Sequence, residues 1–456
     1  MKKVYVLFIL VLLMLLVTMA ANADNYTVSS DSTLTISTVG PHTVTGTATN
    51  AHINCTVPGV TLTLNGVSVT CSSGNPISFT GAGNQMILAD GTTNTFRCTV
   101  FSYSTTNNAA VRVEDTTELT ISGTGTLNAY AGDRGAGIGG GDGNDGGIIT
   151  ISSGTINATG GYLAAGIGGG GHYDYDTASS GGDGGTITIN GGTVTAIGGD
   201  EEGVGIGSGF GFNYTSGNWG TINITGGVVK AYADDDARGA GIGGSAYSPA
   251  GTITISGGLV YAQGYSGGKD IGDGGFMSAG TITIEGDAAV FVARNSYSTP
   301  TLTDGHENKS NADFNANSVY GVVVPGSDFT NSSAAFFRLC TLMYNSNGGT
   351  GTTPDTLIRH YNTTTQVDDG TGLTYTGLIF SGWNTTSSGT GTAYAAGATY
   401  TFNTLLTALF AQWAEIPPTG DANPYINVYV ILAAAAAVIL AGLTIGRRTK
   451  RRKANG

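Results

Sequence analysis

The sequence is short of charge, of cysteine and of histidine. Only 11% of its 456 residues are charged, and 18 basic residues stand against 31 acidic ones, for a net charge of −13. A nucleic-acid-binding protein needs a basic face, so no nucleic-acid partner is expected. Four cysteines are too few for a small secreted domain held by a disulfide framework. The five histidines are scattered and show no metal-ligand spacing.

Glycine, in contrast, is abundant, with 76 residues, or more than twice the usual share of roughly 7%. There is no Gly-X-Y period, which excludes collagen. Hydrophobic residues make up 40% of the chain, which excludes a disordered acidic tail. Few helix formers, together with many Gly, Thr, Ile, Val and Asn residues, predict an all-β chain with tight turns.

Two short elements recur along the middle of the chain. One is a four-residue alternating strand followed by a glycine turn, and successive copies are 38, 35, 31 and 29 residues apart. The other places one isoleucine among glycines, as in Gly137-Ile138-Gly139-Gly140. The copies of the strand are 148–151, 186–189, 221–224, 252–255 and 281–284, and those of the second element are 137–140, 166–169, 205–208 and 241–244.

Short strands and glycine turns in units of about 30 residues are typical of a parallel β-helix, in which each unit is one coil. We expect isoleucines to point inward and glycines to turn the backbone at positive φ. A single coil cannot bury its apolar face, so stacking of the coils makes the core. The prediction is a right-handed parallel β-helix over 24–293, of roughly nine coils, with a cap and linker over 294–337. An antiparallel sandwich is the alternative, and the fixed period disfavours it.

The first part of this region resembles the β-helical carbohydrate-binding domains of secreted bacterial proteins. Leu62 to Val69 and Leu88 to Thr95 carry the resemblance, which covers about 24–160. It implies the β-helical fold. Such relatives are associated with acidic polysaccharides and calcium, but no ligand residue carries over one by one.

A separate module is expected over 338–414. Its landmarks are Tyr344 to Gly349, Gly377 to Trp383 and Leu409 to Trp413. These spaced Gly-Trp and Ala-x-Trp patterns resemble the Listeria–Bacteroides repeat, the B-repeat of internalin-type surface proteins. The resemblance implies a small β-grasp-like fold that serves as a stalk or interaction module. Trp383 and Trp413 would then be core residues, and ligand stacking by them is the alternative.

The beginning of the chain predicts secretion. Lys2 and Lys3 precede an apolar run, and Ala21-Asn22-Ala23 supplies the small residues that a signal peptidase needs. Residues 1–23 are therefore expected to be a signal peptide, and an uncleaved membrane anchor is the alternative.

The end of the chain combines a five-residue motif, an apolar stretch over 428–446 that is long enough to span a bilayer, and a basic cytoplasmic tail over 447–456. This order resembles the sortase sorting signal of Gram-positive surface proteins, with isoleucine in place of the usual leucine. The resemblance implies cleavage after the threonine and transfer to cell-wall peptidoglycan; a plain transmembrane anchor is the alternative. The motif residues are Ile416, Pro417, Pro418, Thr419 and Gly420.

Two sets of side chains are candidates for ligand contacts. Acidic residues in glycine-rich turns offer hard oxygen ligands for calcium, although solvated turn acids are the alternative. Tyrosines near the turns of successive coils offer a flat apolar face and a hydroxyl to sugar rings, although edge packing is the alternative. The acidic candidates are Asp142, Asp145, Asp183 and Asp273, and the aromatic candidates are Tyr130, Tyr173, Tyr175, Tyr232 and Tyr261.

No catalytic residues are predicted. Catalytic β-helices exist, but no arginine or histidine here has the sequence setting found in polygalacturonases, and the paired carboxylates of a hydrolase are not evident. The sequence favours a secreted, wall-anchored adhesin or glycan-binding protein, whose ligand would be a polysaccharide or the surface of a host or neighbouring cell. A polysaccharide lyase or hydrolase and a passive surface spacer are the alternatives. Cys55, Cys71 and Cys98 are expected to be buried thiols, or two of them a disulfide.

Overall fold

The computed structural model describes most of the chain between the predicted signal peptide and the sorting motif. The predicted signal peptide, the predicted membrane segment and the basic tail lie outside the described residues. Among the described residues no helix is long and apolar enough to cross a bilayer. The described residues are 24–99, 108–173, 180–212, 215–234, 238–265, 267–276, 280–293, 297–303, 306–310, 334–361 and 363–416.

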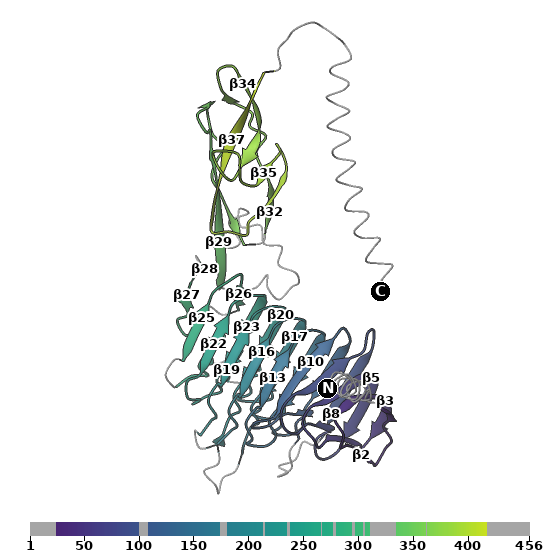
Figure 1. The fold of residues 1–456 in the computed structure, drawn as a ribbon. Coiled ribbons are helices and arrows are strands. Elements are labelled where there is room, and N and C mark those ends of the chain that lie inside the picture. The colour runs from purple at the N-terminus through teal and green to yellow at the C-terminus, as the bar shows by residue number, and fades with distance from the viewer. Residues whose placement is uncertain are drawn as a thin grey trace, which may run out of the picture. The chain divides into compact units, whose positions relative to one another are not determined.

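The chain divides into two compact units, and the first contains a parallel β-helix with three faces (Figure 1). Strands of the first face pair in parallel, coil after coil. They are β7 (Asn84–Leu88), β10 (Glu118–Gly123), β13 (Ile148–Ile151), β16 (Thr186–Ile189), β19 (Thr221–Ile224), β22 (Thr252–Ile255) and β25 (Thr281–Ile284). The parallel pairing is what the repeats predict, and it excludes the antiparallel sandwich.

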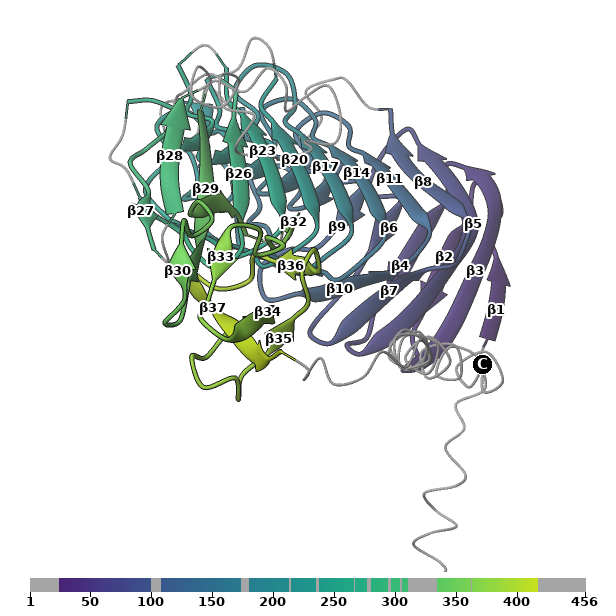
Figure 2. The ribbon, with the colours of Figure 1, turned by 90° about the horizontal axis from the view of Figure 1, so that it is seen from above.

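The second face continues each first-face strand after a short turn, and Figure 2 shows its strands side by side. Its strands are β8 (Thr93–Cys98), β11 (Thr126–Tyr130), β14 (Thr155–Thr159), β17 (Thr193–Ile197), β20 (Val228–Tyr232), β23 (Leu259–Gln263) and β26 (Ala289–Val292). At the N-terminal end, two longer strands span both faces, β3 (Gly40–Thr49) and β5 (Val60–Cys71). Strand β1 (Asp24–Thr27) pairs in parallel with β3.

The third face is a sheet of nine strands within the described residues, most of them only two residues long. In the later coils it is formed by the Gly-Ile-Gly elements, which the sequence predicts to be tight corners with an inward isoleucine and which the structure shows as two-residue strands. Its strands are β2 (Thr33–Ile36), β4 (His52–Cys55), β6 (Ile77–Ser78), β9 (Val111–Arg112), β12 (Ile138–Gly139), β15 (Ile167–Gly168), β18 (Ile206–Gly207), β21 (Ile242–Gly243) and β24 (Ile271–Gly272).

The core of the β-helix consists of aliphatic ladders that run along its axis. Because strands pair without a shift, Ile187 lies beside Ile149 in one direction and Ile222 in the other. All three side chains are fully buried. The second face contributes valines and alanines in the same way, and the third face one isoleucine per coil. Burying such side chains supplies roughly 1.5–3 kcal/mol each, which makes the ladders the main stabilising feature.

The β-helix extends beyond the predicted end at residue 293. Strand β27 (Thr301–Leu302) pairs in parallel with β25, so the ladder gains a further partial coil. Antiparallel pairing then begins, because β28 (His306–Ser310) and β26 both pair with β29 (Ala334–Asn345). Strand β29 thus pairs with the last second-face strand, and it also runs without a break across the predicted boundary at residue 338.

The remaining strands belong to the segment predicted as a repeat module, which contributes to both units. This segment consists of strands and turns, and its described residues contain no helix. The all-β expectation is confirmed there. A β-grasp fold places a helix across its sheet, and the described residues of this segment do not include such a helix. The strands are β30 (Thr350–Gly351), β31 (Leu357–His360), β32 (Thr364–Gln366), β33 (Leu373–Thr374), β34 (Leu378–Asn384), β35 (Ala393–Tyr394), β36 (Thr399–Thr401) and β37 (Leu406–Glu415).

The second unit is built around two tryptophans. Trp383 is buried, and its indole N–H donates to the carbonyl oxygen of Asp368 at 2.7 Å. Trp413 is partly buried and donates to the carbonyl oxygen of Ser346 at 3.0 Å. The ring of Phe380 contacts both, with centroid distances of 5.1 and 6.0 Å. Both tryptophans therefore act as core residues, as the sequence predicts.

The cysteines of the β-helix are buried free thiols. Cys71 lies beside Cys98 on paired strands, and its thiol donates to the carbonyl oxygen of Ala51 at 2.8 Å. Burial raises the pKa of the Cys55 and Cys71 thiols to about 12. The structure thus favours the buried-thiol expectation over the disulfide.

We expect a side chain at a glycine of the third face to destabilise the protein strongly. Gly207 has φ +144°, and a Cβ there would lie 1.8 Å from the carbonyl oxygen of Gly243 in the next coil. Gly207→Ala should therefore force two coils apart and lower the free energy of unfolding by about 4 kcal/mol or more. Chemical denaturation of the two proteins measures this loss.

The matched control is Gly66→Ala, because Gly66 also has positive φ (+73°) but no atom within 4 Å of an added Cβ. Only the backbone penalty of about 1–2 kcal/mol is expected there. Equal losses for both variants would contradict the close-packing account of the third face.

Candidate functional site

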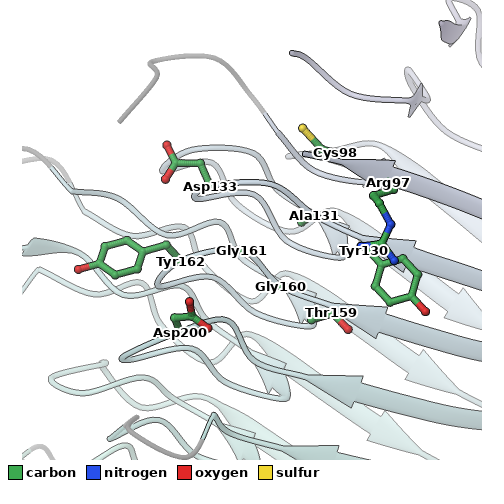
Figure 3. A pocket seen from close by; sticks show the side chains of 10 residues that line it. All are labelled: Arg97, Cys98, Tyr130, Ala131, Asp133, Thr159, Gly160, Gly161, Tyr162 and Asp200. Carbon is green, nitrogen blue, oxygen red and sulfur yellow. The ribbon is translucent and has the colours of Figure 1, made fainter. Parts of the chain in front are cut away.

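A groove of about 470 Å³ lies where second-face strands end and turn toward the third face. Figure 3 shows Arg97, Tyr130 and Thr159 at the strand ends, and Asp133, Tyr162 and Asp200 on the turns. Four successive coils therefore supply its side chains. The lining residues are Arg97, Cys98, Tyr130, Ala131, Asp133, Thr159, Gly160, Gly161, Tyr162 and Asp200.

Strand alternation explains why Arg97, Tyr130 and Thr159 face outward together. In β11, Leu127 and Ala129 point into the core, so Tyr130 points out. The register pairs Tyr130 with Arg97 of β8 on one side and with Thr159 of β14 on the other. The Arg97 guanidinium lies over the Tyr130 ring, 4.0 Å from its centroid. Such a cation–π contact holds the cation and the ring in a defined arrangement.

The turn at Gly160-Gly161 brings the next coil close beneath the groove. A Cβ at Gly161 would lie 1.6 Å from the carbonyl oxygen of Asp133, so only glycine fits there. The Gly161 N–H donates to the carbonyl oxygen of Gly135 at 2.8 Å. The floor of the groove is therefore backbone, and side chains line its sides.

Charged groups at the groove and beside it are paired with one another. The Arg134 guanidinium is buried and lies 3.4 Å from a carboxylate oxygen of Asp133 and 3.2 Å from one of Asp142. The other carboxylate oxygen of Asp142 lies 2.9 Å from Nδ1 of His172. Asp142 is thus held by two basic side chains, which leaves it poorly suited to the calcium role that the sequence suggested. Asp200, in contrast, is exposed at the groove.

The other calcium candidates do not form one site. Asp145 and Asp183 lie in neighbouring turns beside an open groove of about 590 Å³ that leads along the first face. The Asp145 carboxylate accepts a hydrogen bond from the backbone N–H of Asp183 at 2.8 Å. The Asp183 carboxylate accepts hydrogen bonds from the backbone N–H of Asn218, at 2.8 Å, and from its side-chain amide. Burial raises the pKa of the Asp183 carboxyl, and the nearby Asp145 raises it further.

Asp273 is distant in sequence from this pair and accepts a hydrogen bond from the hydroxyl of Ser298. Calcium takes six to eight oxygen ligands. Among the residues that the structure describes, no group of three or more Asp, Glu, His or Cys side chains has a metal-holding arrangement. The four predicted aspartates therefore do not fit a calcium site as a set.

The predicted tyrosines separate into different environments. Tyr130 lines the groove, whereas Tyr173 is partly buried between the rings of Tyr162 and Phe212. Tyr261 is only 4% exposed because Phe291 and Ala335 pack on it, so its prediction as a ligand-stacking ring is wrong. Tyr232 is partly buried and packs on Tyr261, with ring centroids 5.6 Å apart.

Several predicted residues lie outside the described part of the chain. They are Tyr175, Pro417, Pro418, Thr419 and Gly420. Ile416, the first residue of the sorting motif, follows β37 directly and is 51% exposed.

Sequence reasoning missed Arg97, Thr159, Asp133 and Asp200 as groove residues. A signal for the first two existed: aligning the outward positions of Thr-Asn-Thr-Phe-Arg-Cys and Thr-Leu-Asn-Ala-Tyr places Arg97 beside Tyr130. Asp133 and Asp200 lie in turns of different sequence, and nothing in the chain indicated that these turns meet.

Comparison with known families identifies the part of the chain that carries this groove. Residues 30–321 match the family described as "Carbohydrate-binding domain-containing protein", and this match spans more than half of the chain. The chain belongs to this carbohydrate-binding domain family. The groove lies within its carbohydrate-binding domain, on coils formed by residues 93–200.

Beyond the carbohydrate-binding domain, residues 341–412 match the Listeria–Bacteroides repeat domain, which confirms the repeat that the sequence indicated. A solved structure, that of "the polysaccharide lyase-like protein from C. thermocellum", is similar at 21% identity, with a TM-score of 0.34. The similarity covers 61% of this chain and 100% of that chain. No curated protein matches the chain.

The aspartate contacts predict that calcium has little effect on this protein. Because Asp142, Asp183 and Asp273 are engaged by protein donors, adding calcium and then a chelator should leave Tm unchanged. Differential scanning calorimetry of wild type and Asp183→Asn makes the comparison. A calcium-dependent rise in Tm that disappears in Asp183→Asn would contradict this expectation and restore a calcium site beside Asp145.

Proposed function

We propose that this chain is a cell-wall-anchored surface protein that binds a polysaccharide in the groove around Tyr130, without catalysing its cleavage. The observation that carries the proposal is the outward pair of Arg97 and Tyr130 at a groove of the carbohydrate-binding domain. An adhesive role toward a host or neighbouring cell surface is the biological form that we propose for this binding.

The groove has the mixture of groups that a sugar ring requires. Tyr130 and Tyr162 offer apolar ring surface together with hydroxyl groups. Arg97, Thr159 and Asp200 add donors and acceptors for hydroxyl or carboxylate groups of a glycan. A small number of precisely placed polar groups among apolar ones is typical of ligand-binding sites. Arg97 carries positive charge on a protein of net charge −13, so it favours an acidic residue of the ligand.

A binding role fits the carboxylates of the groove better than catalysis does. Glycoside hydrolysis uses two carboxylates, one of which acts as a general acid with a raised pKa. Asp133 is instead paired with the guanidinium of Arg134, 3.4 Å away. We therefore propose binding without cleavage, with lyase or hydrolase activity as the alternative that product release would reveal.

Anchoring to the wall is the second part of the proposal. The last described strand, β37, ends at Glu415, and the exposed Ile416 begins the sorting motif. A transpeptidase needs its motif on an accessible segment beyond the folded domain, and this position supports that requirement. The Listeria–Bacteroides repeat immediately before the motif would act as the stalk.

Replacing Tyr130 by alanine should weaken glycan binding about tenfold, or 1.4 kcal/mol, because one sugar face and the Arg97 support are lost. Wild type and variant are compared on a glycan array and with acidic polysaccharides, and product release is read from the same samples. Tyr375→Ala is the matched control, since Tyr375 is 39% exposed but lies in the repeat segment. Equal binding by wild type and Tyr130→Ala would contradict the proposed site, and released products would support the enzyme alternative.

Anchoring depends on Thr419 if a sortase acts on this chain. In cells that carry the matching sortase, Thr419→Ala should move the protein from the wall fraction to the membrane and medium, because the scissile Thr–Gly bond is altered. Fractionation and immunoblotting measure the distribution, with Thr407→Ala as a control outside the motif. Unchanged wall retention of Thr419→Ala would sink the sortase hypothesis.

A further inference from the structure

A row of aromatic rings continues from the groove onto later coils. Tyr162 lines the groove and also contacts the ring of Tyr173 edge-on, with centroids 5.9 Å apart. Tyr173 in turn contacts Phe212 of the next coil at 4.6 Å. The backbones of these turns are also joined, because the Phe212 N–H donates to the carbonyl oxygen of His172 at 3.1 Å. The rings are therefore held by the same coil-to-coil pairing that holds the strands.

The row extends to Phe276 through a small apolar cluster. Leu163, Phe210 and Ala246 are buried together, and Tyr247 packs against them along with Tyr162 and Tyr173. The ring of Tyr247 is stacked nearly parallel on Phe276, with centroids 4.9 Å apart and planes 11° apart. The row thus begins at Tyr162, in a turn that precedes a third-face strand in the chain, and ends at Phe276, in a turn that follows one.

The last two rings of the row belong to residues with an unusual backbone conformation. Tyr247 and Phe276 have φ of +61° and +68°, a left-handed conformation that is unusual for bulky residues. Phe276 is also 67% exposed, so its ring stays largely in water. Strained backbone and exposed aromatic surface together are typical of ligand-binding sites.

A positioned cation accompanies Phe276. The carboxylate of Glu202 is buried and accepts the Nε–H of Arg238 at 2.7 Å and its backbone N–H at 3.1 Å. This contact directs the partly exposed guanidinium toward the ring of Phe276, 5.8 Å from its centroid. The far end of the row therefore repeats the combination of arginine and aromatic ring found at Arg97 and Tyr130.

We propose that the rings from Tyr130 to Phe276 form one extended track that binds a glycan as a chain lying along the β-helix, with Arg97 and Arg238 at its two ends. This inference rests on the proposed glycan-binding function and adds that the ligand is a polymer rather than a single sugar or chain end. Arg97 and Phe276 are five coils apart, which corresponds to roughly 24 Å at about 4.8 Å per coil. The rise of about 4.8 Å per coil is close to the length of one pyranose unit in an extended chain, so each coil can face one sugar.

The test is a length series of extended oligosaccharides, from disaccharide to hexasaccharide, in a neutral cello-oligosaccharide set and a uronate-containing set. Calorimetric titration of the whole mature protein should show affinity rising at least tenfold from disaccharide to hexasaccharide in the set that binds. Affinity that does not change with length would overturn the track while leaving the groove in place. Failure of both sets to bind at any length would overturn the glycan-binding function and the track together.

Variants at the two ends of the row separate the track from a structural effect. Phe276→Ala should weaken hexasaccharide binding about tenfold and leave disaccharide binding unchanged, whereas Tyr130→Ala should weaken both. Val39→Ala is the control, because Val39 is also 67% exposed but lies near the N-terminal end of the β-helix. Equal losses for both lengths in Phe276→Ala would overturn the proposal. So would a change of oligomeric state on gel filtration with hexasaccharide binding intact, because Phe276 would then contact a second copy.

Discussion

Everything in this β-helix depends on unshifted parallel pairing between successive coils. Because strands such as β13, β16, β19 and β22 meet the corresponding strand of the next coil residue for residue, like side chains lie beside like ones. Inside, this makes the continuous aliphatic ladders that stabilise the domain. Outside, the same pairing lines up whatever residues the strands and turns carry, so a binding surface can be assembled one side chain per coil.

The groove and the aromatic row are two results of this constraint. Arg97, Tyr130 and Thr159 come together because they occupy the same outward position in three paired strands. The turns between second and third faces can approach one another only because residues such as Gly161 have no side chain. Rigid strands therefore set the positions of one side of the site, and close-packed turns set the other. This preorganisation reduces the entropic cost of binding a ligand.

The repeat elements were enough to predict the parallel β-helix, its inward isoleucines and its glycine corners. Contacts made by turns and chain ends could not be predicted in this way, because those segments differ in length and sequence from coil to coil. Tyr261 points outward as its strand pattern predicts, yet Phe291 and Ala335 cover it. Asp142 has the expected glycine-rich setting, yet Arg134 and His172 reach it from other turns. Arg97 lay within reach of sequence reasoning, since it shares the outward register of Tyr130.

The most direct measurement of the central claim is a crystal structure of the mature protein with the glycan that it binds best. We expect sugar density against the Tyr130 ring, within hydrogen-bonding distance of the Arg97 guanidinium. Density confined to the polar groove beside Asp145 and Asp183, or to the tryptophans of the repeat segment, would contradict it. In either of those cases the in-register surface of the second face would have no part in recognition.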